Sequence, residues 1–156
     1  MADFQFSIEI AAPPERIWAA LMDVERWPEW TPTVNRAERL ERNPLAVGSQ
    51  TKILQPKLMP AVWRVTELDE TTGFFTWVTA KPGIQVTATH HLDPIRHGTR
   101  VTLSLHYTGW LGPLMAWQLK SLNWDYLTKE ANGLKQRCER EGPDAGDSSR
   151  PPLIRS

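Results

Sequence analysis

Three side chains of this sequence have the chemistry and the setting for acid–base work. His90 stands on an alternating run from residue 84 to 92, and the other residues on its face are apolar. Tyr107 ends the next alternating run, and Glu67 shares a predicted strand face with Trp63. An imidazole changes charge near neutral pH, and a cyclase could use it to take a proton alpha to a carbonyl. His90 is therefore the candidate catalytic residue, although the same imidazole could instead orient a ligand or serve the structure.

The remaining reactive residue types do not combine into a metal site or an activated nucleophile. His90 and His91 are adjacent on a predicted strand, so their side chains point to opposite faces and cannot readily chelate one ion. An outer-face pair of His91 and His106 is a weak metal candidate. Cys138 falls on an apolar helical stripe, which is typical of a core residue. The sequence has no glycine-rich phosphate loop, and we expect neither a metal nor a cofactor.

Tryptophan is the unusual component of the composition, with eight residues in 156. Each indole ring can bury on the order of 150–250 Å² and still needs a partner for its N–H group. The rings either fill a large core or line an aromatic cavity for a flat, apolar ligand. Trp27 and Trp30 have both interpretations, as a plug at the open end of a sheet or as part of a gate over the cavity.

Charge and length restrict the class of protein. The 18 basic and 18 acidic residues give a formal net charge of zero, so no basic field is available to hold nucleic acid. No apolar run reaches the ~20 residues that span a bilayer, and the N-terminus lacks the pattern of a signal peptide. A single cysteine allows no intramolecular disulfide. We expect one cytoplasmic domain without nucleic-acid binding or integral membrane association.

The elements that must position these side chains follow from periodicity. Residues 4–10 alternate as a half-buried strand, and Pro13 and Pro14 then begin a helix with apolar residues three and four apart. A short turn or second helix surrounds Trp27 and Trp30. Six further strands are predicted at 34–42, 48–55, 61–68, 73–80, 84–92 and 99–107. The first of these six is mostly polar and is expected near a sheet edge.

A long helix is predicted over residues 112–141, where apolar residues recur with helical spacing. Strands of alternating polarity cannot bury their apolar face alone, so this helix must cover the sheet. Gly133 inside the helix costs ~1 kcal/mol against alanine, which indicates a close backbone approach or a bend. Residues 142–156 have no periodicity and are predicted to be a disordered tail. The chain is thus predicted to be α+β, with one domain at 1–141.

The order of these segments resembles a known family. The run FTWVTAKPGIQVTATHHLDPIRHGTRVTLSLHYTG, then GPLM and GLKQRCE, and the earlier stretch APPERIWAALMDVERWPEWTPTV carry the resemblance. They are similar to the polyketide cyclase/dehydrase-like branch of the SRPBCC (START/Bet v 1-like) superfamily over roughly residues 4–141. The resemblance implies a helix-grip fold, in which a seven-stranded curved antiparallel sheet wraps around the long C-terminal helix. Two short helices follow the first strand.

The resemblance also implies which side chains meet a ligand. Members bind lipids, sterols or polyketides in a central cavity, and some catalyse cyclisation or aromatisation there. Carried over by position, the residues that would face the cavity are Trp63, Phe75, Trp77, His90, Tyr107, Met115 and Leu119, with Trp27 and Trp30 near its mouth. The segment 54–62, which carries two prolines, is a lid candidate.

Three functions remain open at the level of sequence. The first is a carrier or sensor that binds a small hydrophobic or aromatic molecule, lipid- or polyketide-like. The second is a polyketide cyclase/aromatase or dehydratase that uses His90 as general acid/base. The third is an interaction module in which Trp110-Leu111 and Leu58-Met59 contact a protein partner. We favour the first, because apolar burial supplies affinity and a few polar groups such as His90 fix orientation.

Overall fold

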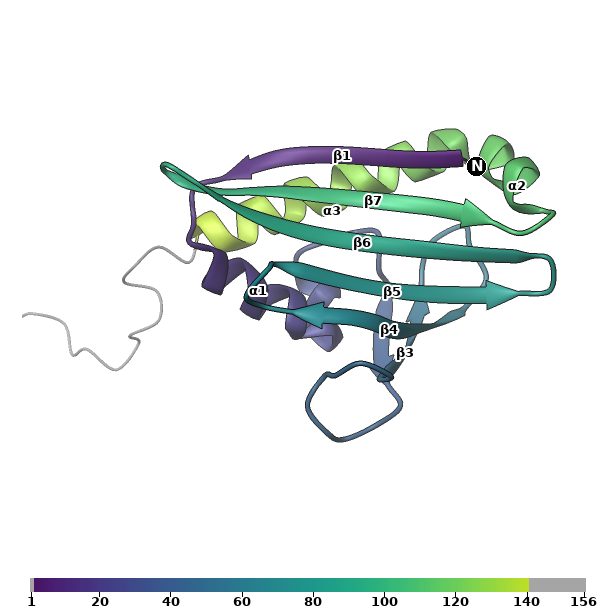
Figure 1. Ribbon diagram of the computed structural model, residues 1–156, viewed down its shortest axis with the longest axis horizontal. Coiled ribbons are helices and arrows are strands. Elements are labelled where there is room, and N and C mark those ends of the chain that lie inside the picture. The colour runs from purple at the N-terminus through teal and green to yellow at the C-terminus, as the bar shows by residue number, and fades with distance from the viewer. Residues whose placement is uncertain (1, 141–156) are drawn as a thin grey trace, which may run out of the picture.

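The computed structural model describes residues 2–140, and in this part of the chain a seven-stranded antiparallel sheet curves along one long helix (Figure 1). The strands are β1 Ala2–Ile10, β2 Arg36–Arg39, β3 Gln50–Leu54, β4 Ala61–Asp69, β5 Phe74–Lys81, β6 Ile84–Ile95 and β7 Gly98–Thr108. The helices are α1 Pro14–Met22, the short 3-10 helix η1 Val24–Glu29, α2 Gly112–Gln118 and α3 Lys120–Arg140. The predicted domain boundary at 141 and the predicted tail at 142–156 lie outside the described residues.

The strand order is β1-β7-β6-β5-β4-β3-β2, so consecutive hairpins join β2 through β7. β1 departs from this order and pairs antiparallel with β7, which places Phe4 opposite Leu105 and Ile8 opposite Val101. β2 lies at the end of the sheet, which confirms the edge position predicted for residues 34–42. The α+β helix-grip architecture, with two short helices after the first strand, is confirmed.

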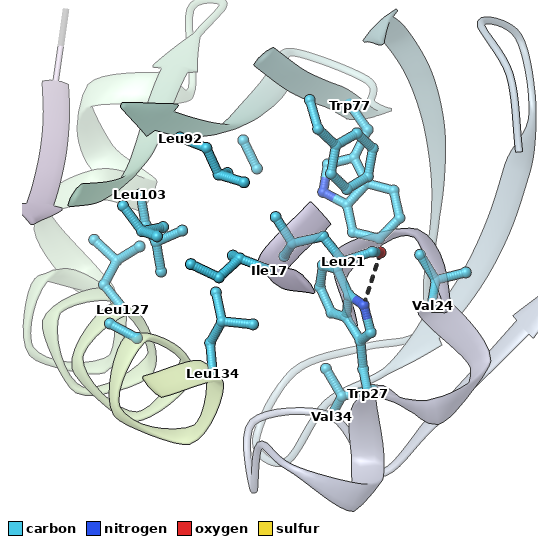
Figure 2. Packing of buried hydrophobic residues seen from close by; sticks show 14 of the residues in the cluster. Ile17, Leu21, Val24, Trp27, Val34, Trp77, Leu92, Leu103, Leu127 and Leu134 are labelled. Atoms are coloured by element: carbon cyan, nitrogen blue, oxygen red, sulfur yellow. Dashed lines mark hydrogen bonds between the residues drawn. The ribbon is translucent and has the colours of Figure 1, made fainter. Parts of the chain in front are cut away.

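α1 and η1 close one end of the sheet because prolines start α1 and an apolar stripe anchors it. Pro13 is extended, with φ −69°, and Pro14 opens the helix without needing an N–H partner. Ile17 and Leu21 are fully buried and point into the core (Figure 2). The indole Nε1 of Trp27 donates to the carbonyl oxygen of Leu21 at 3.1 Å, which satisfies the buried N–H group. These contacts make η1 part of the core.

The C-terminal helical segment is two helices, where the sequence predicted one. Leu119 separates α2 from α3 with φ −100° and ψ 12°, and its backbone N–H donates to the carbonyl oxygen of Met115 at 2.9 Å. No glycine or proline stands at this junction, so the sequence carries no breaker signal there. α2 packs against the ends of β1, β6 and β7, while α3 runs along the sheet (Figure 1). Tertiary packing therefore sets the break.

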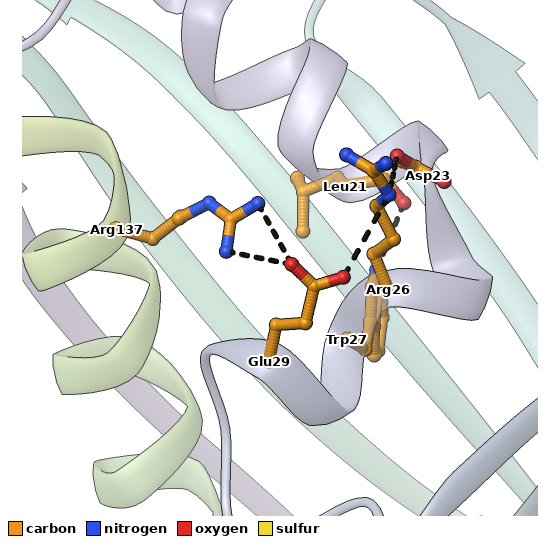
Figure 3. A network of polar contacts seen from close by, with 6 residues as sticks. All are labelled: Leu21, Asp23, Arg26, Trp27, Glu29 and Arg137. Atoms are coloured by element: carbon orange, nitrogen blue, oxygen red, sulfur yellow. Dashed lines mark hydrogen bonds and ion pairs between the residues drawn. The ribbon is translucent and has the colours of Figure 1, made fainter. Parts of the chain in front are cut away.

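α3 approaches η1 so closely that only glycine fits at residue 133. A β-carbon on Gly133 would lie 1.9 Å from the carbonyl oxygen of Trp30. The close backbone approach predicted for this glycine is thus confirmed. Beside it, both terminal nitrogens of Arg137 on α3 donate to Glu29 Oε1 at 3.3 Å, and Glu29 also pairs with Arg26 at 3.7 Å (Figure 3). These contacts fix η1 against α3.

Candidate functional site

A cavity of about 460 Å³ lies between the concave face of the sheet and the helices α2 and α3. This volume falls within the range of roughly 300–1,000 Å³ that is usual for small-molecule sites. Its lining comes from β3 to β7, from α2 and α3, from the loop between β3 and β4, and from Trp27 of η1 and the nearby Val34. The exposed lining residues Lys57, Met59 and Lys81 mark the opening to solvent. The concave face of the sheet therefore forms one side of the cavity, and α2 and α3 cover the other side.

The structure brings seven of the nine sequence-predicted ligand residues to the cavity surface. They are Trp27, Trp63, Trp77, His90, Tyr107, Met115 and Leu119. Phe75 instead lies fully buried under the imidazole of His90, with the two rings stacked at 4.9 Å and 16°. Trp30 packs against Trp27, with ring centroids 5.4 Å apart, and its backbone abuts α3 at Gly133. Phe75 and Trp30 therefore pack behind the lining residues His90 and Trp27 and are not themselves part of the cavity lining.

An aromatic wall forms one side of the cavity. The ring of Trp77 lies 5.1 Å from Trp27 and 5.7 Å from Trp63, measured between centroids. Trp63 and Trp77 come from β4 and β5, and Trp27 comes from η1. Trp27, which the sequence analysis expects near the mouth, is only 2% exposed. Its hydrogen bond to the α1 backbone holds it there.

A buried histidine–glutamate pair is the main polar feature of the cavity wall. His90 Nε2 lies 3.0 Å from Glu130 Oε1, and the two side chains are 5% and 16% exposed. His90 Nδ1 lies 3.2 Å from the carbonyl oxygen of Phe75. A carbonyl oxygen can only accept, so Nδ1 is the donor in this contact and Nε2 is the ring nitrogen that faces the carboxylate of Glu130.

Glu130, the partner of His90, is a residue that the sequence analysis does not identify. Glu130 is three residues after Leu127 and four before Leu134, so it lies on the buried stripe of α3. A charged residue at core spacing on an amphipathic helix is rare unless it is paired. The helical spacing of Glu130 from Leu127 and Leu134 was the available signal in the sequence. Its partner is the inward-facing His90 on the sheet that α3 covers.

Tyr107 and Asn123 form a second polar group nearer α2. The Tyr107 hydroxyl donates to Asn123 Oδ1 at 3.0 Å. Burial raises the pKa of Tyr107 above its usual 10.0, against a smaller lowering by the Asn123 hydrogen bond, so the phenol stays protonated at neutral pH. Tyr107 is thus a hydrogen-bond donor here and not a base. Asn123 was not predicted, because an asparagine inside a helix gives no functional signal on its own.

Glu67 does not face the cavity, which corrects the expectation that it shares a face with Trp63. A bulge interrupts the pairing of β4 with β5, so that Val65 lies opposite Trp77 but Glu67 lies opposite Thr76. Glu67 Oε1 accepts a hydrogen bond from the Thr76 hydroxyl at 3.2 Å on the outer face. The extra residue of the bulge inverts the side-chain alternation that the sequence predicted.

His91 and His106 lie on the outer face, as the alternation predicted, while His97 lies in the turn between β6 and β7. His91 stacks on Phe74 with centroids 4.1 Å apart, and His106 contacts the carboxylate of Asp3. Across β6 and β7, His91 lies opposite Thr102 and His106 opposite Thr87, so the two imidazoles are not a directly opposed pair. Within residues 2–140 there is no cluster of three or more potential metal ligands. Across the same residues, no helix has both the length and the apolarity that a bilayer span requires.

The loop between β3 and β4 borders the opening and is tied to α3. The hydroxyl of Tyr126 donates to the backbone carbonyl of Pro56. Burial, with a further contribution from Asp125, raises the pKa of Tyr126, so this donor stays protonated at neutral pH. In the same loop Leu58 lines the cavity, while Met59 is 75% exposed. The segment predicted as a lid thus lies beside the opening, and its function as a lid remains a prediction.

Comparison with known proteins identifies the family. The chain matches the family model described as polyketide cyclase / dehydrase and lipid transport over residues 1–139, and it belongs to this family. A search of curated proteins found no match.

Solved structures share the fold at low sequence identity. A protein from Thermobifida fusca, solved in solution by NMR, is 22% identical with a TM-score of 0.75, over 91% of this chain and 96% of that one. The Zhui aromatase/cyclase from a Streptomyces species is 16% identical with a TM-score of 0.75, over 93% and 98%. Norcoclaurine synthase from Thalictrum flavum, in complex with dopamine and hydroxybenzaldehyde, is 14% identical with a TM-score of 0.69, over 87% and 85%. At these identities the likeness shows the helix-grip fold.

Proposed function

We propose that the protein is a carrier or sensor that binds a small hydrophobic or aromatic molecule in the cavity between the sheet and α3. The observation that carries this proposal is the open cavity of about 460 Å³ with the rings of Trp27, Trp63 and Trp77 in its wall. Its polar groups are few and lie at separate points of an otherwise apolar surface, which suits orientation of a ligand more than tight polar recognition.

Apolar burial is sufficient for useful affinity. A two- or three-ring aromatic that buries about 300 Å² of its apolar surface gains roughly 7 kcal/mol at ~25 cal/mol per Å². Part of this gain is offset by lost translational and rotational freedom. Because this offset amounts to several kcal/mol, dissociation constants between tens of micromolar and millimolar are expected for simple probes.

Titration with the neutral fluorophore N-phenylnaphthylamine tests the proposal, because its emission rises in an apolar site. We expect saturable binding of one probe per chain. Native mass spectrometry of protein purified from its own source then identifies any resident small molecule that denaturation releases. Absence of saturable probe binding by a correctly folded chain contradicts the proposal.

A second candidate function is supported by the buried pair of His90 and Glu130. This function is a cyclase/aromatase or dehydratase in which the pair is the general acid/base. In a dehydration the pair would accept the proton alpha to a carbonyl, and the C–O bond to the leaving hydroxyl would break. Returning the same proton to the hydroxyl releases water and restores the pair.

Paired substitutions distinguish catalysis from binding. His90→Gln keeps a polar side chain of similar reach but cannot exchange a proton in this way, and Glu130→Gln removes the carboxylate. For an enzyme, turnover disappears in both variants while probe binding persists. If His90→Gln turns over normally, the acid/base function of His90 is wrong.

A further inference from the structure

The outer side of α2 carries large apolar side chains that are open to solvent. Leu114 and Trp117 are 49% and 73% exposed, and Trp110, in the turn before the helix, is 80% exposed. Leu114 and Trp117 are three residues apart, so they share one face of the helix. Exposed apolar residues of a soluble domain are normally scattered singly, whereas a cluster of them marks an interaction site. Trp110, Leu114 and Trp117 form the α2 patch.

The other side of α2 lines the cavity, so the α2 patch lies at its rim. Met115 and Leu119, four residues apart, contribute to the lining. A β-carbon on Gly83, in the turn between β5 and β6, would lie 2.8 Å from the indole of Trp110. The backbone N–H of Leu111 donates to the carbonyl oxygen of Gly83 at 2.9 Å. α2 is thereby held beside the turn between β5 and β6 at one end of the sheet (Figure 1).

The segments around this rim carry positive charge. Residues from three segments line the cavity here, namely 55–60 between β3 and β4, 81–85 around the turn between β5 and β6, and 108–120 with α2. These segments contain three exposed lysines, Lys57, Lys81 and Lys120, and no aspartate or glutamate. The whole sequence has a formal net charge of zero, so the excess of positive charge is a local property of this rim.

We propose that this face docks on an anionic lipid surface, with the α2 patch in the interfacial layer of the bilayer and the three lysines against the headgroups. Tryptophan rings gather at membrane interfaces because they are apolar with one polar N–H group. Each lysine near an anionic leaflet increases the partition coefficient about fivefold. This docking goes beyond the proposed function, because the side chains of the α2 patch do not line the cavity.

The mixture of residues favours a lipid surface over a protein partner. Lysine is depleted in protein–protein interfaces, whereas lysine together with tryptophan and leucine is typical of helices that lie in the plane of a bilayer interface. α2 has seven residues, so its length of about 10 Å suits the interfacial layer and not a span of the hydrocarbon core. The surface therefore fits reversible, peripheral docking.

Docking in this orientation brings the cavity opening to the bilayer. Met115 and Leu119 line the cavity from the inner side of α2, while the outer side of the same helix meets lipid. Lys57 and Lys81 lie at the opening itself. An apolar molecule can then pass between bilayer and cavity without crossing bulk water. This consequence, unlike the docking, rests on the proposed function.

Flotation of the purified chain with unilamellar vesicles tests the docking. Vesicles of phosphatidylcholine with about 30% phosphatidylserine are compared with pure phosphatidylcholine vesicles, at about 0.1 M and about 0.5 M NaCl. We expect at least about tenfold stronger partitioning onto the anionic vesicles at the lower salt concentration. Most of this difference should disappear at the higher salt concentration, because salt screens the lysine charges.

Trp117→Ala tests the apolar part of the docking surface. Burial of roughly 60 Å² of an indole corresponds to about a tenfold change in partition coefficient, so we expect about tenfold weaker binding to the anionic vesicles. Val47→Ala is the control, because Val47 is 63% exposed in the loop between β2 and β3, away from the three segments of the rim. This control should bind the vesicles as the wild type does.

Lys120→Gln tests the charged part. We expect about fivefold weaker binding to the anionic vesicles and no change with pure phosphatidylcholine. Lys52→Gln is the control, because Lys52 is an exposed lysine on β3, outside the three segments of the rim. Without vesicles, Trp117→Ala and Lys120→Gln should both bind N-phenylnaphthylamine normally, since neither residue lines the cavity. Melting curves establish that each variant is folded.

The outcomes separate this inference from the proposed function. Equal partitioning of the wild type onto both kinds of vesicle, or undiminished binding by folded Trp117→Ala, overturns the docking, and saturable probe binding would still support the proposed function. A dimer in light scattering that Trp117→Ala dissociates, without vesicle binding, also overturns it and assigns the α2 patch to a second copy of the chain. Binding to anionic vesicles by a chain that binds no probe supports the docking and contradicts the proposed function.

Discussion

Replacing Gly133 with alanine tests how α3 and η1 are held together. The new β-carbon would lie 1.9 Å from the carbonyl oxygen of Trp30, far inside the 3.0 Å below which the structure must shift. The neighbouring atom is backbone, so no side-chain rotation can relieve the contact. Either η1 or α3 must move, and the ion pair between Glu29 and Arg137 lies beside the contact.

Two opposing effects determine the magnitude. Alanine improves helix propensity over glycine by ~1 kcal/mol. Overpacking costs about 1–3 kcal/mol and more where the clash is with backbone. At a separation of 1.9 Å we expect the clash to dominate, with a net loss of about 2 kcal/mol in the free energy of unfolding. For a chain of 156 residues this corresponds to a fall in Tm of roughly 4–8 °C.

Urea and thermal unfolding followed by circular dichroism measure this loss. Asn132→Ala is the control, because Asn132 is exposed on the same helix and gains propensity without a clash. We expect Asn132→Ala to be neutral or slightly stabilising. A Gly133→Ala variant as stable as this control would refute the close approach of η1 to α3.

Three other perturbations follow from the site and its supports. Trp77→Ala removes the central ring of the aromatic wall, so the free energy of unfolding in urea should fall by about 3 kcal/mol and the affinity for N-phenylnaphthylamine should fall with it. Glu139 has a pKa below its usual 4.5, mainly through its hydrogen bond from Lys135, so it stabilises the fold above that pH and loses this contribution as the pH falls through the lowered value. The urea midpoint of Glu139→Gln should therefore depend less steeply on pH below 4.5 than that of the wild type. Tyr126→Phe removes the bond to Pro56 and should accelerate dissociation of N-phenylnaphthylamine in stopped-flow measurements.

Each of these has an outcome that contradicts it. Trp117 is an exposed tryptophan on α2 and is the control for Trp77. Equal losses of stability and of probe affinity in Trp117→Ala and Trp77→Ala would contradict the central position of Trp77 in the aromatic wall. Parallel acid-unfolding profiles of wild type and Glu139→Gln would show that Glu139 is not linked to folding. An unchanged dissociation rate in Tyr126→Phe would show that the loop between β3 and β4 does not control release.

Alternation of polarity was a sound guide to the sheet and to the inward direction of His90. The run 84–92 places His90 among apolar residues because side chains alternate on a strand, and burial of the imidazole confirms that placement. The same rule failed at Glu67, because a bulge adds a residue that periodicity alone does not reveal. The strand periodicity thus predicted the fold and one polar point of the cavity.

The helix contributions to the cavity were harder to predict. Glu130 and Asn123 both lie on the buried stripe of α3, yet a polar residue inside a helix usually faces water, so neither gives a functional signal in the sequence. Their function depends on His90 and Tyr107 across the cavity, which are distant in sequence. The break at Leu119 likewise follows from packing of α2 on the sheet end, since no breaker residue stands there. These features require the three-dimensional arrangement.

The bulge in β4 also determines where this strand can change length. Elsewhere in the sheet, loss of one residue would turn every following side chain to the opposite face. Val65 already pairs with Trp77 and Glu67 with Thr76, so Thr66 is the extra residue of the bulge and has no opposite residue in the register with β5. A chain lacking Thr66 would keep Trp63 and Val65 inward and Glu67 outward, with the pairing made continuous. The strand beside the aromatic wall therefore contains a position where one residue can be deleted without rebuilding the cavity.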